Sequence, residues 1–174
     1  MAIRPIVIVP HEALSRKAEE ITDITETIRQ LARDMADTMY RAPGVGLAAN
    51  QVGEPLRLIV VDVEYAYAEP KDKKKQPNIL VNPRICLAEG AESKEEGCLS
   101  VPDFGVEISR ATKVKVEALD LEGKPINIEA SGLMARALQH EIDHLNGTTV
   151  LDHASALKRG LYHRRLRKKT RSDR

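Results

Sequence analysis

One clear helical pattern of apolar positions lies in the first third of the chain. Between residues 23 and 41 apolar side chains recur three and four residues apart, which predicts an amphipathic helix (Ile24, Ile28, Leu31, Met35 and Met39). Asp23, followed by Glu26, predicts a capping pair at its start. Ala42-Pro43 predicts its end.

Two more helices are predicted in the last third of the chain. The first begins at Ser131, its expected N-cap, and ends at Asn146-Gly147. Its sequence carries two stripes at helical spacing, so this helix should be buried on two faces (Leu133, Ala137, His140 and His144; Met134, Leu138, Ile142 and Leu145). The second, roughly residues 155–167, carries much of the basic C-terminal end.

Strands are predicted where apolar residues are continuous or alternate. The aliphatic run 56–63 predicts a buried strand, and residues 79–81 predict a short strand that stops at Asn82-Pro83. Residues 114–118 and 126–130 alternate around a Gly-containing turn, which predicts an antiparallel hairpin with one buried face. Residues 65–78, rich in lysine, are expected to form a surface loop.

This order of elements predicts an α+β fold. We expect a single domain over residues 1–174, in which antiparallel or mixed sheets pack around the helix that begins at Ser131, with a further helix at the C-terminus. A chain of 174 residues is long enough to bury a sizeable core. With only 3% aromatic residues, that core must be built from aliphatic side chains.

Composition favours a protein of the cytoplasm. No apolar run approaches the roughly 20 residues that span a bilayer, and the first residues lack the pattern of a signal peptide. We therefore expect no membrane partner. The two cysteines, Cys86 and Cys98, do not suggest a disulfide framework in a reducing compartment, and the default for each is a buried small hydrophobe.

Charge is distributed unevenly along the chain. Residues 158–174 contain nine Lys or Arg and one acid, a charge of +8, whereas the other 18 bases and 25 acids give −7. A basic tail on an acidic body suggests a polyanionic partner, and a solvated, frayed end is the alternative. Recognition of specific DNA sequences is not expected.

The predicted buried helix contains the motif His140-Glu141-Ile142-Asp143-His144, an HExxH pattern. Four residues advance about 400° on a helix, so both imidazoles project from one face and can share a cation. Glu141 is turned about 100° away, where its carboxylate can take a proton from a metal-activated water. The alternative is a pair of core histidines that bond to the backbone.

Two histidines leave such a site short of a protein ligand. The metzincin pattern would place a third histidine at position 150, which is Val150, and no glutamate follows Glu141 to complete a thermolysin-like site. His153 stays open as a donor, although it lies beyond the predicted helix end. Cys98 is the better candidate, because thiolate binds metals well and the preceding glycine permits a tight turn.

Three segments together resemble the three motifs of bacterial peptide deformylases. They are Gly44–Gln51 (GVGLAANQ), Glu96–Ser100 (EGCLS) and Gln139–Leu145 (QHEIDHL), and they occur intact and in this order. The resemblance implies removal of the N-formyl group from the first methionine of new proteins. It also implies one divalent metal, held by Cys98, His140 and His144 with a water as fourth ligand. Iron(II) is typical of the family, and zinc, nickel or cobalt can take its place.

The same resemblance implies roles for the other motif residues. The Gln51 amide and the Leu99 backbone N–H would donate to the developing oxyanion, while Glu141 transfers the proton. The substrate residues would be Gly44, Val45 and Gly46 in the first motif, with Leu133 and Ala137 on the helix, forming a methionine pocket. Arg136 would lie near that pocket or reach solvent. Because the substrate emerges from the ribosome, the basic tail would contact the ribosome.

Two other functions remain open from the sequence. An HExxH metallopeptidase of another specificity would use the same water chemistry, but its further ligand is missing here. A noncatalytic ribosome- or RNA-binding protein with a structural metal would need a closed site of four protein ligands, and the chain offers three good ones.

Overall fold

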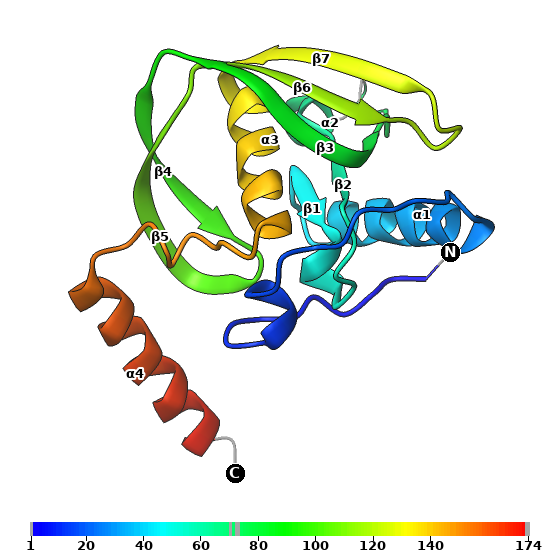
Figure 1. The fold of residues 1–174 in the computed structure, drawn as a ribbon. Coiled ribbons are helices and arrows are strands. Elements are labelled where there is room, and N and C mark those ends of the chain that lie inside the picture. Colours follow the sequence, from blue (N-terminus) through cyan, green and yellow to red (C-terminus); the bar gives the residue numbers. More distant parts are fainter. Residues whose placement is uncertain (1, 70, 72–73, 173–174) are drawn as a thin grey trace.

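The computed structural model describes residues 2–69, 71 and 74–172, with side chains as far as residue 168. Parts of the predicted 65–78 loop and of the basic tail (70, 72–73 and 173–174) lie outside the described residues. The fold is α+β, as predicted, with two antiparallel sheets and a C-terminal helix (Figure 1). No helix in the described part of the chain is long and apolar enough to cross a membrane.

The larger sheet has the order β1-β2-β3-β6-β7, with each neighbouring pair antiparallel. Its strands are β1 (Gly46–Ala48), β2 (Leu58–Val61), β3 (Asn78–Glu89), β6 (Lys113–Leu119) and β7 (Pro125–Ser131). The smaller sheet is a hairpin of β4 (Glu92–Cys98) and β5 (Val101–Arg110). The helices are α1 (Glu26–Arg41), α2 (Val63–Tyr67), α3 (Gly132–Leu145) and α4 (Ala156–Ser172), with 3₁₀ turns η1 (Glu12–Leu14) and η2 (Ala49–Val52).

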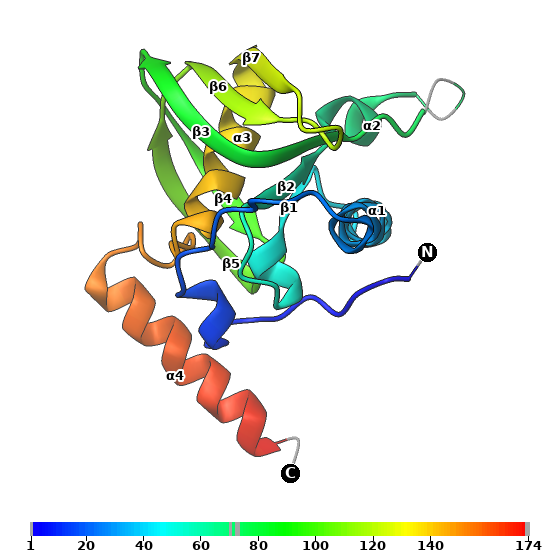
Figure 2. The same ribbon diagram turned by 45° about the vertical axis from the view of Figure 1, so that its right-hand side comes forward.

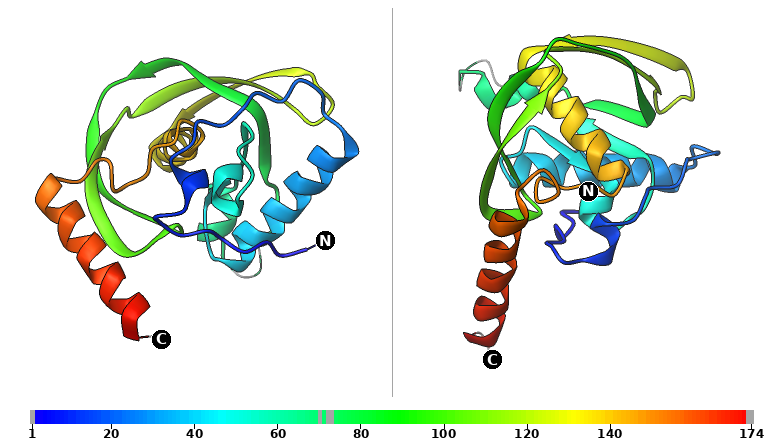
Figure 3. Two further views of the ribbon diagram at one scale, coloured as in Figure 1. Left: turned by 60° about the horizontal axis from the view of Figure 1, so that its bottom comes forward. Right: turned by 60° about the vertical axis from the view of Figure 1, so that its left-hand side comes forward.

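Helix α3 lies between the two sheets, and the strands curve around it (Figure 3, left). Its buried apolar side chains pack on one face of the larger sheet, in a cluster that includes Leu138, Ile142, Leu145, Ile59 and Val116. The predicted burial of this helix on two faces is confirmed beyond its first turn: Leu138 and Leu145 are fully inaccessible, Ala137 and His144 are buried, and Leu133 at the start is exposed. The helix is therefore held rigidly along most of its length.

The opposite face of the larger sheet is covered by α1, which Figure 2 shows nearly end-on beside β1 and β2. Alternation along β2 explains both contacts: Leu58 and Val60 pack with Met35 and Met39 of α1, while the intervening side chains pack toward α3. Every residue of β2 is buried, as the aliphatic run predicted.

Several predicted boundaries were wrong for identifiable reasons. Thr25, not Asp23, caps α1, because its extended backbone lets the hydroxyl accept from the amide of Ile28. β3 does not stop at Asn82-Pro83 but continues to Glu89. A register shift absorbs the proline, and the Asn82 amide bonds the backbone of Ile21 at both N–H and C=O.

The remaining differences follow from local caps and from exposed strands. Asp62 ends the aliphatic run and caps α2, so the predicted 65–78 loop begins as a short helix. The strands β1, β4 and β5 were not predicted: β1 has three residues, and β4 is mostly exposed and polar. Ser131 does begin α3, yet its side chain makes no capping bond. α4 extends beyond the predicted 155–167, to Ser172.

Gly147, just after α3, supplies a test of this packing. Its φ is +76°, and a Cβ there would lie 2.7 Å from the carbonyl oxygen of Ser15. We expect Gly147→Ala to lower the free energy of unfolding by about 1–3 kcal/mol, through strain and this contact. Gly160→Ala is the matched control, because a Cβ there meets no described atom within 4 Å and alanine favours a helix. Urea denaturation measures both; equal effects would contradict this packing.

Candidate metal centre and active site

Helix α3 presents His140 and His144 on one face, one turn apart. Their ring centroids lie 5.0 Å apart, and His144 is almost fully buried. Burial and the neighbouring His140 hold the pKa of His144 well below its ordinary value, so its imidazole is neutral. Neutral imidazole is the form that binds metal ions.

The end of β4 brings Cys98 to these histidines. The ladder between β4 and β5 shifts register between Glu96 and Cys98, and this irregularity turns Cys98 toward α3. The sulfur lies 3.2 Å from Nε2 of His144. One ligand atom from each of Cys98, His140 and His144 lies within 4.8 Å of the others, the one such group found in the described part of the chain.

The three side chains fit a transition-metal ion. A thiolate and two imidazoles suit iron(II), zinc, nickel or cobalt better than magnesium or calcium, which prefer oxygen. Cys98 and His140 also line a cleft of about 510 Å³, so the group is open on one side to incoming molecules. Three protein donors beside a cleft are typical of catalytic sites, in contrast to the four of structural sites.

Behind the cluster, the carboxylate of Glu96 contacts three nitrogen-bearing side chains at once. Its carboxylate accepts from Arg110 at 3.0 and 3.1 Å and from Arg136 at 2.6 Å, and it lies 3.0 Å from Nδ1 of His140. Burial alone would raise the pKa of Glu96, but these hydrogen bonds and charges outweigh it and lower the pKa to about 2. Glu96 is therefore ionised, and it orients His140 with Nε2 away from itself.

Glu141 lies against the first motif. Its side chain is buried, and a Cβ on Gly46 would come within 2.4 Å of its Oε1, so only glycine fits at position 46. Oε2 finds no hydrogen-bond partner among the described residues. Burial raises the pKa of Glu141 to about 7. The group is thus poised to hold or release a proton near neutral pH.

Gln51 faces the cluster from η2. The backbone N–H of Ala48 donates to its Oε1 at 2.9 Å, which fixes the amide. Nε2 then points toward the sulfur of Cys98 at 3.6 Å and the hydroxyl of Ser100 at 3.3 Å. The cleft in front of Gln51 is lined by Leu99 and by all the residues that the family resemblance suggested for substrate contact. They are Gly44, Val45, Gly46, Leu133 and Ala137.

The structure decides three placements that the sequence left open or assigned by default. Arg136 is mostly buried against Glu96 and the carbonyl of Glu92, with a small exposed part. His153 is not in the cluster, since its Nε2 lies 3.1 Å from Asp143. Cys86 is exposed on β3, contrary to the default for a cysteine.

Sequence reasoning missed the role of Glu96. Its place two residues before a candidate ligand was a signal, but its partner Arg110 is distant in sequence and on a strand that was not predicted.

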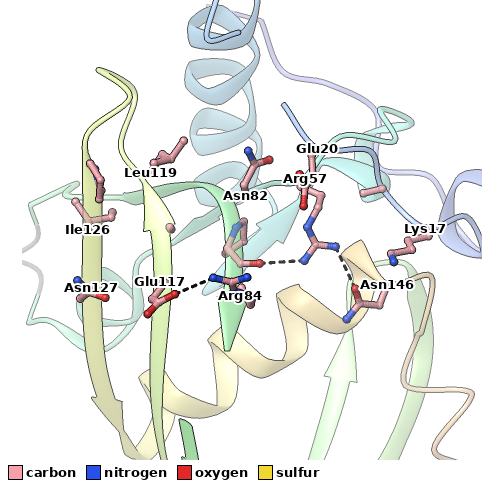
Figure 4. Close-up of a pocket in the computed structure, with 14 residues that line it drawn as sticks. Lys17, Glu20, Arg57, Asn82, Arg84, Glu117, Leu119, Ile126, Asn127 and Asn146 are labelled. Atoms are coloured by element: carbon pink, nitrogen blue, oxygen red, sulfur yellow. Dashed lines mark hydrogen bonds and ion pairs between the residues drawn. The ribbon is translucent and has the colours of Figure 1, made fainter. Parts of the chain in front are cut away.

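A larger cavity, of about 830 Å³, lies between the 17–20 segment, the bulge of β3 and the β6–β7 hairpin (Figure 4). It contains none of the motif residues; its arginines are bonded to neighbouring groups, as Arg57 is to Asn146 and Arg84 is to Glu117.

Comparison with known proteins places this geometry in a family. Residues 3–160 match the model of the family described as polypeptide deformylase. The chain belongs to the polypeptide deformylase family. It is 45% identical to the peptide deformylase of Brucella suis biovar 1 over 169 residues, which cover 97% of this chain and 94% of that protein.

Other members of the family agree over nearly the whole length. The peptide deformylase of Thermodesulfovibrio yellowstonii is 47% identical over 169 residues, covering 97% of this chain and 99% of the relative. The crystal structure of the peptide deformylase from Legionella pneumophila superposes with a TM-score of 0.87 at 45% identity, covering 99% of this chain and 98% of the other.

The buried charges behind the cluster generate a stability prediction. Arg110 bonds both Glu96 and Asp143 and is nearly inaccessible. Removing one partner of a buried ion pair leaves an uncompensated charge, so Arg110→Met should lower the free energy of unfolding by about 3 kcal/mol. The same substitution at exposed Arg84, which pairs with Glu117 on the surface, should cost less than about 1 kcal/mol. Urea denaturation of metal-free protein tests this, and equal losses would refute it.

Proposed function

We propose that this protein is a peptide deformylase that hydrolyses the formamide bond at the N-terminal methionine of newly made polypeptides and releases formate. The observation that carries the proposal is the joining of Cys98, His140 and His144 at a cleft that Glu141 and Gln51 also reach. Family membership over almost the entire chain supports the same reaction.

Cys98, His140 and His144 would hold one divalent ion, iron(II) by preference, with zinc, nickel or cobalt as substitutes. A bound ion supplies Lewis-acid activation of water at neutral pH. Glu96 would fix the ring of His140 through Nδ1, as carboxylates commonly do behind histidine ligands.

The chain's own groups would handle the proton and the developing charge. Glu141 accepts the proton of the attacking water as its oxygen adds to the formyl carbon. The formyl oxygen gains negative charge, which the Gln51 amide and the Leu99 backbone N–H stabilise. One such donor lowers the activation free energy by roughly 3 kcal/mol. Glu141 then gives the proton to the amine nitrogen as the C–N bond breaks, leaving formate and a free N-terminal methionine.

Substrate would bind in the cleft in front of these groups. Val45, Leu133 and Ala137 provide an apolar lining beside His140 for the methionine side chain. Gly44 and Gly46, without side chains, let the substrate backbone approach β1, an edge strand of the larger sheet, where it can pair as an added strand.

The two alternatives fit less well. A metallopeptidase with an HExxH motif would need a further ligand from the chain, and His153 is bonded to Asp143 instead. A structural metal would be enclosed by four ligands, whereas this group opens onto the cleft.

The first of three predictions from the proposed function tests the chemistry through Glu141. Glu141→Gln keeps the size of the side chain but removes its basic oxygen, so metal content should persist. Turnover should fall by roughly 10²–10⁴-fold, the loss typical of a missing general base. The measurement is formate release from a formyl-Met tripeptide per bound ion, on protein shown to be folded. Near-normal turnover at full metal content would remove Glu141 from the mechanism.

A second prediction concerns the metal. Cys98→Ser replaces the soft thiolate with a poor ligand, so metal content after anaerobic purification should fall sharply. Cys86→Ser is the matched control, since Cys86 is exposed on β3 and should leave metal content unchanged. With iron bound, exposure to air should also inactivate the wild type, because ferrous ion and thiolate are both oxidisable. Equal metal occupancy in the two serine variants would rule out Cys98 as a ligand.

The basic end of the chain would contact the ribosome, and the protein would work in the cytoplasm, where nascent chains emerge. Residues 158–174 carry a charge of +8, and α4 presents exposed cations such as Arg164 and Arg167. The helix is anchored to the body by Tyr162, which is buried against Phe104. Removing the helix would expose that contact, so charge reversal is the cleaner test.

Arg164→Glu with Arg167→Glu should weaken salt-sensitive co-sedimentation with ribosomes, because phosphate contacts depend on positive charge. Hydrolysis of a formyl-Met tripeptide should be unaffected, since both residues lie outside the cleft. Reversing exposed Lys113 and half-buried Lys115 of β6 supplies a control of equal charge change at a distant place. Undiminished ribosome binding by the α4 double variant would end this proposal.

A further inference from the structure

A second groove adjoins the active-site cleft, beside α4. Asp103 and Phe104 of β5 line the cleft and also line a groove of about 270 Å³. The opposite wall of this groove is formed by α4, with Lys158, Leu161 and Arg165. The two spaces therefore adjoin at Asp103 and Phe104, so the groove is the next surface along β5 for a chain that leaves the cleft past Phe104.

Contacts between α4 and β5 hold the groove open in a defined shape. The Tyr162 hydroxyl donates to the carbonyl of Pro102 at 2.9 Å, and its ring meets Phe104 edge-on at 5.0 Å. Lys158 donates to the carbonyl of Gly105 at 2.6 Å and lies over the Phe104 ring. This wall is therefore positioned before any ligand arrives, which reduces the entropy cost of binding there.

The groove combines an apolar floor with positive charge. Leu161 is 53% exposed and lines the same groove as the aromatic ring of Phe104. Lys158 and Arg165 contribute two positive charges and Asp103 one negative charge, so the groove is net positive. An apolar side chain with an acidic neighbour complements this surface.

We propose that this groove binds the stretch of the polypeptide substrate that lies downstream of the formylated methionine, and that it favours an apolar residue beside an acidic one. The proposal rests on the proposed deformylase function, because that function supplies a polypeptide whose first residue occupies the adjoining cleft. The residues shared by the two spaces select this occupant: a substrate anchored at the cluster holds its own later residues near Phe104 and Leu161 at high effective concentration.

The test compares kcat/KM for a formyl-Met-Ala-Ser tripeptide with that for extensions of about ten residues, long enough to leave the cleft. One extension ends in alternating Leu and Glu, the other in alternating Ser and Lys. At low salt the wild type should favour the Leu-Glu extension over the tripeptide by about three- to tenfold, mainly through KM, because remote contacts are equal in ground and transition states. The Ser-Lys extension should give no gain.

Matched variants on α4 separate the groove from the rest of the helix. Arg165→Glu should abolish the increase in kcat/KM that the Leu-Glu extension gives, and a Leu-Lys extension should give the increase instead. Arg164→Glu, at the neighbouring residue outside the groove, should leave the wild-type preference unchanged. Leu161→Ser should reduce the gain, and Leu157→Ser, at a leucine that is more exposed and lies outside the groove, should not. A loss of helix packing alone would not reverse the charge preference.

Two outcomes would overturn the inference while leaving the deformylase function intact. One is equal kcat/KM for the tripeptide and both extensions in the wild type. The other is an Arg165→Glu variant that loses ribosome binding but keeps the wild-type preference among peptides, which would assign the groove to a ribosomal partner. Failure of the metal-loaded wild type to hydrolyse the tripeptide would instead overturn the proposed function itself, and this inference with it.

Discussion

The carboxylate of Glu96 is buried at the interface between the β4–β5 hairpin and α3. There it forms ion pairs or hydrogen bonds with Arg110, Arg136 and His140. A buried charge is tolerated only when it is paired and hydrogen-bonded, so these partners must remain in place for the fold to be stable. The hairpin and the helix are thereby fixed to each other. Cys98, two residues after Glu96, is delivered to the histidines by the same attachment.

The other parts of the site depend on the same rigid pair of elements. Glu141 points from a neighbouring side of α3, about 100° round the helix from His140, where Gly46 leaves room for its carboxylate and burial raises its pKa to about 7. β1, which carries Gly46, is held between α1 on one face of the sheet and α3 on the other. The side of the helix that carries His140 and His144 and the side that carries Glu141 are thus positioned by two separate packing contacts.

Much of this arrangement could be predicted from the sequence. The spacing of the histidines fixed their shared face, and the apolar stripes indicated that α3 is buried, because helical periodicity is a local property. The β6–β7 hairpin was predicted from the alternation of apolar with polar residues along its two strands. Cys98 was the favoured third donor because the rival positions had the wrong residue or lay past the helix end, and the structure places its sulfur beside His144.

The rest depended on contacts between distant segments. β4 is exposed and polar, so it lacks the alternation that marks a strand, and it forms only because β5 pairs with it. The bonds of Glu96 to Arg110 and Arg136 span 14 and 40 residues and leave no periodic signal. Asn82 continues β3 past a proline through bonds to Ile21, which no local rule anticipates.

The most direct test of this account is the affinity of the metal-free protein for cobalt(II), measured by optical titration against a competing chelator. Glu96→Gln keeps the shape of the side chain but cannot accept from the arginines and His140 as a carboxylate does. The account predicts a 10–100-fold weaker affinity, the usual cost of losing a group that orients a metal ligand. Glu95→Gln, its exposed neighbour on β4, should bind cobalt as the wild type does. A folded Glu96→Gln variant with wild-type affinity would contradict the account.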